Sequence, residues 1–300
     1  MNINIITDKM KGKITVKTAT YVGIGVLGLI FLIWALRPSK ESVDTARVQR
    51  GVYEQIIQED GVTRVREKYT ILSPYSGQLQ RVERHAGDTV KKGDTLAIVA
   101  WDFMAPIRSP ENGSILRVIR EDAGPIEIGQ PIMEIGNTSS LEVVIDVLST
   151  DSVHIRAGNT VKIPRWGGEN ALDAKVRLVE PQAFIKISSL GVEERRVHIL
   201  ADITTAREIW AALGDNYRLE CQIVVFRQEN ALKVHTGALF RDGAGWAVFR
   251  VVNGKALKTP VTVARRGPLE AMVESGLSEN DEVIIYPGDT IKNGSRVREM

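Results

Sequence analysis

The chain has 300 residues, of which 43% are hydrophobic and 25% are charged, a composition that excludes a disordered chain and a polytopic membrane protein. The formal net charge is +2. Six of the basic residues but only one acid fall in residues 1–40. The remaining chain is therefore slightly acidic, which argues against a nucleic-acid-binding protein. A single cysteine, Cys221, excludes an intrachain disulfide.

The first predicted element is a membrane-spanning helix at residues 18–36. The stretch Thr18–Leu36 has 19 residues without a charge, close to the length that crosses a bilayer. Four lysines precede it, so the positive-inside rule places the tail 1–17 in the cytoplasm and the rest on the far side. A cleaved signal peptide is the alternative, but no small-residue cleavage site follows Leu36. We therefore expect an uncleaved single-pass anchor, with the C-terminal domains on the far side of the membrane.

The chain after Pro38 reads as mainly β-structure. Short runs rich in Val and Ile are separated by Gly, Pro, Asn and Asp, a pattern typical of strands and turns. The runs are Ser140–Leu148, Val161–Pro164, Ala174–Glu180, Arg196–Ile203, Leu219–Phe226, Gly245–Val252 and Glu282–Tyr286. One helix is predicted, over Thr205–Leu213. Alternating βαβ units are absent, which excludes Rossmann and TIM-barrel folds.

An internal repeat lies in residues 73–135. Residues 73–99 align with residues 109–135 at a shift of 36, which pairs Ser-Pro with Ser-Pro and several glycines and apolar residues with their equivalents. Four glycines are expected where turns need positive φ or where backbones approach closely: Gly77, Gly93, Gly113 and Gly129. Two copies of a unit that cannot close a core alone predict a flattened β-sandwich with pseudo-twofold symmetry.

This repeat resembles the biotinyl/lipoyl domain, whose halves meet at a hairpin that carries the modified lysine. The equivalent stretch here is Ala100-Trp101-Asp102-Phe103, and Asp102 stands where the lysine would be. A carboxylate cannot form the amide to biotin or lipoate. We therefore expect the fold without the carrier chemistry, and no cofactor.

The order of segments resembles the HlyD-like membrane fusion proteins, the periplasmic adaptors of efflux pumps and type I secretion systems. The likeness extends from about Asp44 to Val297. It implies first membrane-proximal strands at 44–66, a lipoyl-like domain at 67–137, a β-barrel at 138–230 and a membrane-proximal β-domain at 231–300. It also implies that the anchor lies in the inner membrane and that the C-terminal domains are periplasmic.

The sequence departs from the family between the lipoyl halves. Many members carry a long helical hairpin there, which reaches toward an outer-membrane channel. Only Ala100–Arg108 joins the halves here, with Pro106 inside, and nine extended residues span about 30 Å at most. The family's channel docking therefore does not carry over, and the chain either uses another surface, serves a transporter without a channel, or has lost an ancestral hairpin.

Trp101 and Phe103, which flank Asp102 at this junction, are candidate partner contacts. The alternative is that both rings fold back on the edge of the sandwich. The four histidines lack metal-ligand spacing, so no metal site is predicted. Cys221 reads as a packing residue. Glu193–Arg196 reads as a solvated, self-compensating charge cluster, with an interaction patch as the alternative.

The sequence therefore predicts a non-enzymatic adaptor without catalytic residues. The partners that the resemblance implies are an inner-membrane transporter and further copies of the chain in a ring. An outer-membrane channel is a further candidate partner, and nucleic acid is not expected to bind. An alternative is a membrane-anchored periplasmic binding or regulatory module uncoupled from an outer-membrane channel. A carboxylase-type enzyme with a biotinyl-like carrier domain is disfavoured by Asp102.

Overall fold

The computed structural model describes residues 40–300, so the predicted anchor at 18–36 lies outside the described residues. No helix within residues 40–300 is long and apolar enough to span a bilayer. The chain divides into two compact units, each described by itself. The central unit is Val52–Glu229, and the C-terminal unit combines the residues up to Gly51 with Asn230–Met300. The division falls inside two long strands, β3 (Gln49–Val65) and β16 (Arg218–His235).

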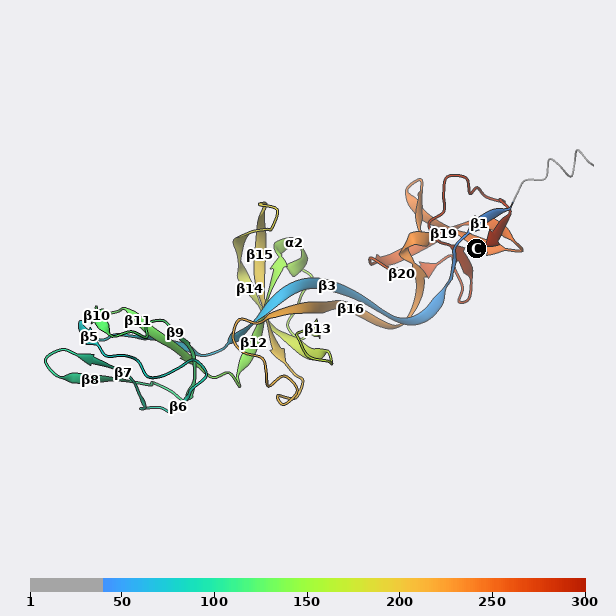
Figure 1. The fold of residues 1–300 in the computed structure, drawn as a ribbon. Helices are drawn as coiled ribbons and strands as arrows, with labels where there is room; N and C mark the ends of the chain where they lie inside the picture. Colours follow the sequence, from blue (N-terminus) through green and yellow to red (C-terminus); the bar gives the residue numbers. More distant parts are fainter. Residues whose placement is uncertain (1–39) are drawn as a thin grey trace, which may run out of the picture. The chain divides into compact units, whose positions relative to one another are not determined.

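The first part of the central unit is a sandwich of two four-stranded sheets, here called the repeat sandwich (residues 68–136) (Figure 1). One sheet has the order β10-β5-β7-β8 and the other β4-β11-β9-β6. The bounds are β4 Lys68–Leu72, β5 Gly77–Leu79, β6 Thr89–Val90, β7 Thr95–Ala100, β8 Met104–Arg108, β9 Gly113–Val118, β10 Gly124–Ile126 and β11 Pro131–Gly136.

The topology of the repeat sandwich shows why neither repeat closes a core alone. A shift of 36 residues carries β4, β5, β6 and β7 onto β8, β9, β10 and β11. Each sheet takes its two central strands from one repeat and its two edge strands from the other. The apolar pairs aligned by the sequence repeat all lie in one buried cluster: Leu79 and Ile115, Val90 and Ile126, Leu96 and Ile132, Val99 and Ile135. The predicted pseudo-twofold sandwich is confirmed.

The second part of the central unit is a six-stranded barrel. Its strands follow the order β13-β14-β15-β12-β3-β16, and pairing of β13 with β16 closes the circle. The additional bounds are β12 Leu141–Leu148, β13 Thr160–Arg165, β14 Leu172–Ile187 and β15 Glu193–Ile203, with a one-turn helix α2 at Ser149–Ser152. Alternate residues of these strands point inward, which buries a continuous Val, Ile and Leu core.

The predicted helix at Thr205–Leu213 is wrong. This segment consists of turns, in which Ile209 donates its N–H to Ala206 and Leu213 donates its N–H to Trp210. The indole of Trp210 donates to the carbonyl of Thr205 at 2.9 Å and is buried in the barrel core. Packing of Trp210 and Leu213 against the barrel therefore outweighs local helix propensity.

The C-terminal unit is a second β-domain. Its sheet continues from the end of β16 through β20, β19, β18 and β21 to β2, and a parallel pair joins β1 to β22. The bounds are β1 Glu41–Val43, β2 Thr45–Arg47, β17 Phe240–Asp242, β18 Gly245–Val252, β19 Lys255–Arg266, β20 Glu270–Ser275, β21 Glu282–Ile284 and β22 Val297–Glu299, with a 3₁₀ turn at Thr236–Ala238. The first described strand thus pairs with the last.

Candidate functional site

The junction between the two repeats is a tight β-hairpin. Strands β7 and β8 pair up to Ala100 and Met104. Trp101 donates its N–H to the carbonyl of Phe103 at 3.1 Å, which leaves Asp102 at the tip. Three residues therefore close the hairpin, and the structure has no helical insertion at this point of the described chain.

The hairpin presents an aromatic cluster, here called the aromatic tip (Tyr75, Trp101 and Phe103). The ring of Trp101 stacks on Tyr75 with centroids 5.7 Å apart, and Phe103 lies 6.5 Å from Tyr75. Trp101 and Phe103 nevertheless remain 58% and 59% exposed, and the neighbouring Met104 is 60% exposed. The rings thus do contact the sandwich edge, and they also leave a large apolar surface in solvent, which is the kind of patch that partners use.

The hairpin has no attachment point for biotin or lipoate. Asp102 is exposed at the tip, and the two strands from Thr95 to Arg108 contain no lysine. A swinging arm needs a primary amine at this tip to form its amide. The residues present therefore do not fit either group.

The four repeat glycines fall into two structural pairs. Gly93 and Gly129 have φ of +88° and +83°, a region that favours glycine. Gly77 and Gly113 instead lie against backbone: a Cβ on Gly77 would stand 2.4 Å from the carbonyl oxygen of Ala100, and one on Gly113 2.7 Å from that of Gly136. Equivalent glycines of the two repeats thus have equivalent roles.

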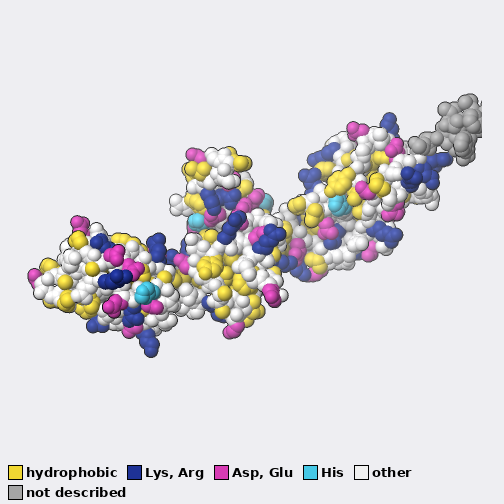
Figure 2. Space-filling model, viewed as in Figure 1, with side chains coloured by type: hydrophobic (Ala, Val, Ile, Leu, Met, Phe, Trp, Pro, Cys, Tyr) yellow, Lys and Arg dark blue, Asp and Glu magenta, His cyan; other side chains and the backbone are white. Residues whose placement is uncertain are grey.

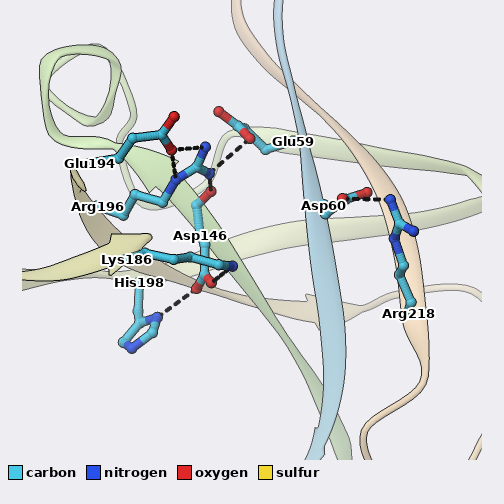
Figure 3. Close-up of polar contacts among 8 residues, drawn as sticks. All are labelled: Glu59, Asp60, Asp146, Lys186, Glu194, Arg196, His198 and Arg218. Atoms are coloured by element: carbon cyan, nitrogen blue, oxygen red, sulfur yellow. Dashed lines mark hydrogen bonds and ion pairs between the residues drawn. The ribbon is translucent and has the colours of Figure 1, made fainter. Parts of the chain in front are cut away.

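A network of charged side chains covers part of the barrel surface (Figure 3). Arg196 of β15 forms ion pairs with Glu59 of β3 at 3.0 Å and with Glu194 at 2.8 Å, and it donates to the carbonyl of Asp146 at 2.6 Å. Burial opposes the charge of Arg196, but the hydrogen bonds to both glutamates outweigh it and raise the pKa of the guanidinium. Its side chain is only 16% exposed. Within Glu193–Arg196, Arg196 is therefore a cross-strand link and not a solvated charge, which corrects the sequence interpretation.

The carboxylate of Asp146 joins two further strands in Figure 3. It accepts a hydrogen bond from Lys186 of β14 at 2.6 Å, and it lies 2.8 Å from Nδ1 of His198 on β15. The imidazole also stacks on Phe184, with centroids 4.2 Å apart. Asp60 and Arg218 form a separate pair at 2.7 Å between β3 and β16. These contacts involve five strands, β3, β12, β14, β15 and β16, and place no nucleophile beside the histidine.

A second, more deeply buried carboxylate lies on β12. Glu142 is 4% exposed. Its Oε1 accepts from Arg64 of β3 at 2.8 and 2.6 Å, and its Oε2 accepts from Arg177 of β14. Arg177 also pairs with Asp202 of β15 at 3.1 Å. Sequence reasoning missed this site because its partners lie 78 and 35 residues away from Glu142.

The remaining candidate groups do not assemble a reaction centre in the described chain. Residues 40–300 contain no cluster of three His, Cys, Asp or Glu side chains that could hold a metal ion. His85 is exposed in its turn. Cys221 is buried in the barrel, and this burial raises the pKa of its thiol to about 12. An inert thiol at neutral pH agrees with the packing role predicted for it.

Two family models match the chain. "Biotin-requiring enzyme" matches residues 69–135, which is the repeat sandwich, and "YknX, C-terminal permuted SH3-like domain" matches residues 231–299 in the C-terminal unit. The first description names a domain that this chain carries without the lysine. A curated protein of Bacillus subtilis (strain 168), described as "Putative efflux system component YhbJ", is 26% identical over 93 residues. That match covers 31% of this chain and only 42% of the relative.

Solved structures share the fold over most of the chain. MacA from Actinobacillus actinomycetemcomitans aligns with a TM-score of 0.62 and 14% identity, covering 81% of this chain and 99% of that one. A MacA-MexA chimera with the Pseudomonas aeruginosa MexA α-hairpin domain aligns with a TM-score of 0.58 and 15% identity, covering 80% and 100%. At this identity the likeness establishes the fold. The domain matches, the efflux-system relative and the shared fold agree with the resemblance of the sequence to the HlyD-like membrane fusion proteins.

Proposed function

We propose that the chain is a non-enzymatic periplasmic adaptor that docks on an inner-membrane transporter and supports export across the envelope. The observation that carries this proposal is the combination of a lipoyl-type sandwich without its lysine, a closed barrel and a C-terminal unit that matches an SH3-like domain model. The chain thus retains binding domains and lacks the carrier chemistry. Energy for transport would come from the partner.

The proposed anchor is the apolar stretch at residues 18–36. It would place residues 1–17 in the cytoplasm and the two described units on the periplasmic side. An anchored adaptor needs only modest affinity for each partner, because the tether raises its effective concentration at the membrane. A homo-oligomeric ring would add further shared interfaces.

The aromatic tip is the proposed partner contact at the far end of the repeat sandwich. In family members that have a helical hairpin, that hairpin is inserted at the same junction between the repeats and reaches toward the channel. Here the exposed rings of Trp101 and Phe103 stand at that position. Aromatic side chains contribute large contact area and are frequent hot spots of interfaces. Trp101, Asp102 and Phe103 are therefore the residues through which we propose that a channel or another partner binds.

In-cell photocrosslinking tests the adaptor function. A photoreactive residue replaces Leu269 of the C-terminal unit, which is 72% exposed, or Phe103 of the aromatic tip. The matched control replaces Val153, which is 67% exposed on the barrel. We expect the Leu269 probe to capture an inner-membrane transporter and the Val153 probe to capture it much less. Capture of no transporter by an abundant, anchored chain would contradict the export function.

A second candidate function is an anchored periplasmic binding or regulatory module. The three-residue closure of the β7–β8 hairpin favours it, because the extension that reaches outer-membrane channels in the family is missing. The Phe103 probe separates the two functions: capture of a channel supports full envelope export, whereas capture of a different periplasmic protein supports the module.

A further inference from the structure

The end of the C-terminal unit where the described chain begins carries a basic face. Strands β1 and β22 run parallel, with Glu41 opposite Val297 and Ser42 opposite Arg298. An isolated bridge then places Lys255 opposite Arg296. The basic face is defined here as Lys40, Lys255, Arg296 and Arg298, all of which are exposed. Figure 2 shows Lys and Arg side chains gathered where β1 begins.

The alternation of the two strands separates the charges by face. Val43 and Val297 point into a buried cluster with Phe249, Ile284 and Ile291. Residues at even positions of β1 and β22 point the other way, because strand side chains alternate. Arg298 accordingly donates from Nε to the hydroxyl of Ser42 at 2.9 Å on that outer side.

The acidic residues of both strands lie on the same side of the strands as Val43 and Val297, opposite the basic face. Glu41 and Glu299 occupy odd positions, and Glu299 accepts a hydrogen bond from Thr45 at 3.2 Å. None of the four basic side chains forms an ion pair within the described residues. The outer side is therefore an uncompensated patch of positive charge, beside the exposed side chain of Met300.

The covalent chain restricts what this face can meet. The proposed anchor ends at Leu36, and only Arg37-Pro38-Ser39 separates it from Lys40. Four residues reach about 14 Å at most. Pairing with β22 and the Lys255 bridge hold the other three cations beside the same strand. All four charges must therefore lie close to the plane of the headgroups, where anionic lipids attract Lys and Arg within about one Debye length.

From this juxtaposition we propose that the basic face binds the anionic headgroups of the bilayer in which the chain is anchored. The inference rests on the anchor of the proposed function and adds a second, electrostatic attachment to it. Two attachments, a helix and a charged face, restrict the orientation of the C-terminal unit on the membrane more than one attachment does. The partner is lipid phosphate, and an acidic surface of a transporter is the competing occupant.

The test uses the full chain in vesicles, with a fluorophore on Met300→Cys, because Met300 is 82% exposed and the native Cys221 is buried. A headgroup-attached spin label quenches the fluorophore when the face touches lipid. We expect about threefold stronger quenching in phosphatidylglycerol-containing vesicles than in phosphatidylcholine, and loss of the difference in 0.5 M salt. Each cation near an anionic surface changes the partition constant by roughly fivefold.

Three variants sharpen the experiment. The first replaces the basic face by glutamine (Lys40→Gln, Lys255→Gln, Arg296→Gln, Arg298→Gln) and abolishes the lipid dependence. The second exchanges Lys and Arg at the same positions and retains it, which shows that charge matters and that the fold is intact. The third is a control with the same charge change on exposed residues of the central unit (Lys91→Gln, Arg156→Gln, Lys175→Gln, Arg195→Gln) and retains the wild-type response.

Each other result overturns the proposal in a distinguishable way. Equal quenching in both lipids, with the chain still resistant to carbonate extraction, overturns lipid binding and leaves the anchor standing. Loss of the lipid dependence in the control variant shows a general charge effect. A chain that is extracted by carbonate overturns the anchor and the lipid face together. Lipid-independent crosslinking of position 300 to a transporter assigns the basic face to that protein.

Discussion

Replacement of Glu142 by glutamine removes one negative charge from the most buried ion pair of the barrel. The carboxylate is 4% exposed and accepts hydrogen bonds from Arg64 and Arg177, so its loss affects three strands at once. A glutamine of the same size can satisfy one arginine with its oxygen, but its amide group then faces the donors of the other.

The expected cost follows from the exposure of the partners. Loss of one member of a buried ion pair costs about 3–5 kcal/mol when the remaining charge is uncompensated. The side chains of Arg64 and Arg177 are 43% and 40% exposed, so water replaces part of the lost interaction. We therefore expect a destabilisation of about 2 kcal/mol, because hydrogen bonds to charged groups contribute roughly 1.5–3 kcal/mol.

Hydrogen-exchange mass spectrometry of the full chain measures this effect locally, since a chain with several units need not unfold in one step. A loss of 2 kcal/mol corresponds to about 30-fold faster exchange in peptides of β3, β12 and β14, the strands that carry the three residues. The control Glu169→Gln changes an exposed glutamate of the same barrel and leaves exchange unchanged. An increase of less than threefold in the exchange rate of Glu142→Gln would refute the argument. It would show that the ion pairs of Glu142 are screened by water and contribute little to stability.

Three further predictions concern other parts of the central unit. Gly77→Ala destabilises the repeat sandwich by about 1–3 kcal/mol through overpacking, because its Cβ would stand 2.4 Å from a backbone oxygen. Gly93→Asn is nearly neutral, since asparagine tolerates positive φ. Urea unfolding compares the free energies of unfolding of the two variants. Cys221 reacts with maleimide at pH 8 only after denaturation, because burial raises the pKa of its thiol to about 12, and rapid native labelling would disprove this. The hydrogen bond from Lys162 lowers the pKa of Glu54 below its ordinary value of 4.5. The ionised carboxylate therefore stabilises the folded chain fully above pH 4.5, and this stabilisation is lost as the pH falls through the lowered pKa. We expect Glu54→Gln to lose less stability on acidification than the wild type does, and parallel curves of stability against pH would contradict the assignment.

The repeat sandwich could be predicted from the sequence because its signal is local and duplicated. Glycines and apolar residues recur at one shift, and the same residues line the core. The exchange of edge strands between the sheets follows from pseudo-symmetry, since Gly77 and Gly113 meet equivalent backbone neighbours.

The charged networks of the barrel could not be predicted in this way. Glu142, Arg64 and Arg177 meet only when β12 lies between its partners, so no spacing in the sequence reveals them. The error at Thr205–Leu213 has a related cause. Local propensity favours a helix there, but Trp210 is buried by contacts with strands distant in sequence.

The parallel pairing of β1 with β22 has a consequence for the order of events during synthesis. The central unit is contiguous and can fold as soon as Glu229 has emerged, whereas the C-terminal unit needs residues from both of its separate segments. At about 5–20 residues per second, Asn230–Met300 take roughly 4–14 s to appear. Until then, β1 and β2 have no strands to pair with and present open edges. The segment nearest the proposed anchor is thus made before the central unit and is completed after it.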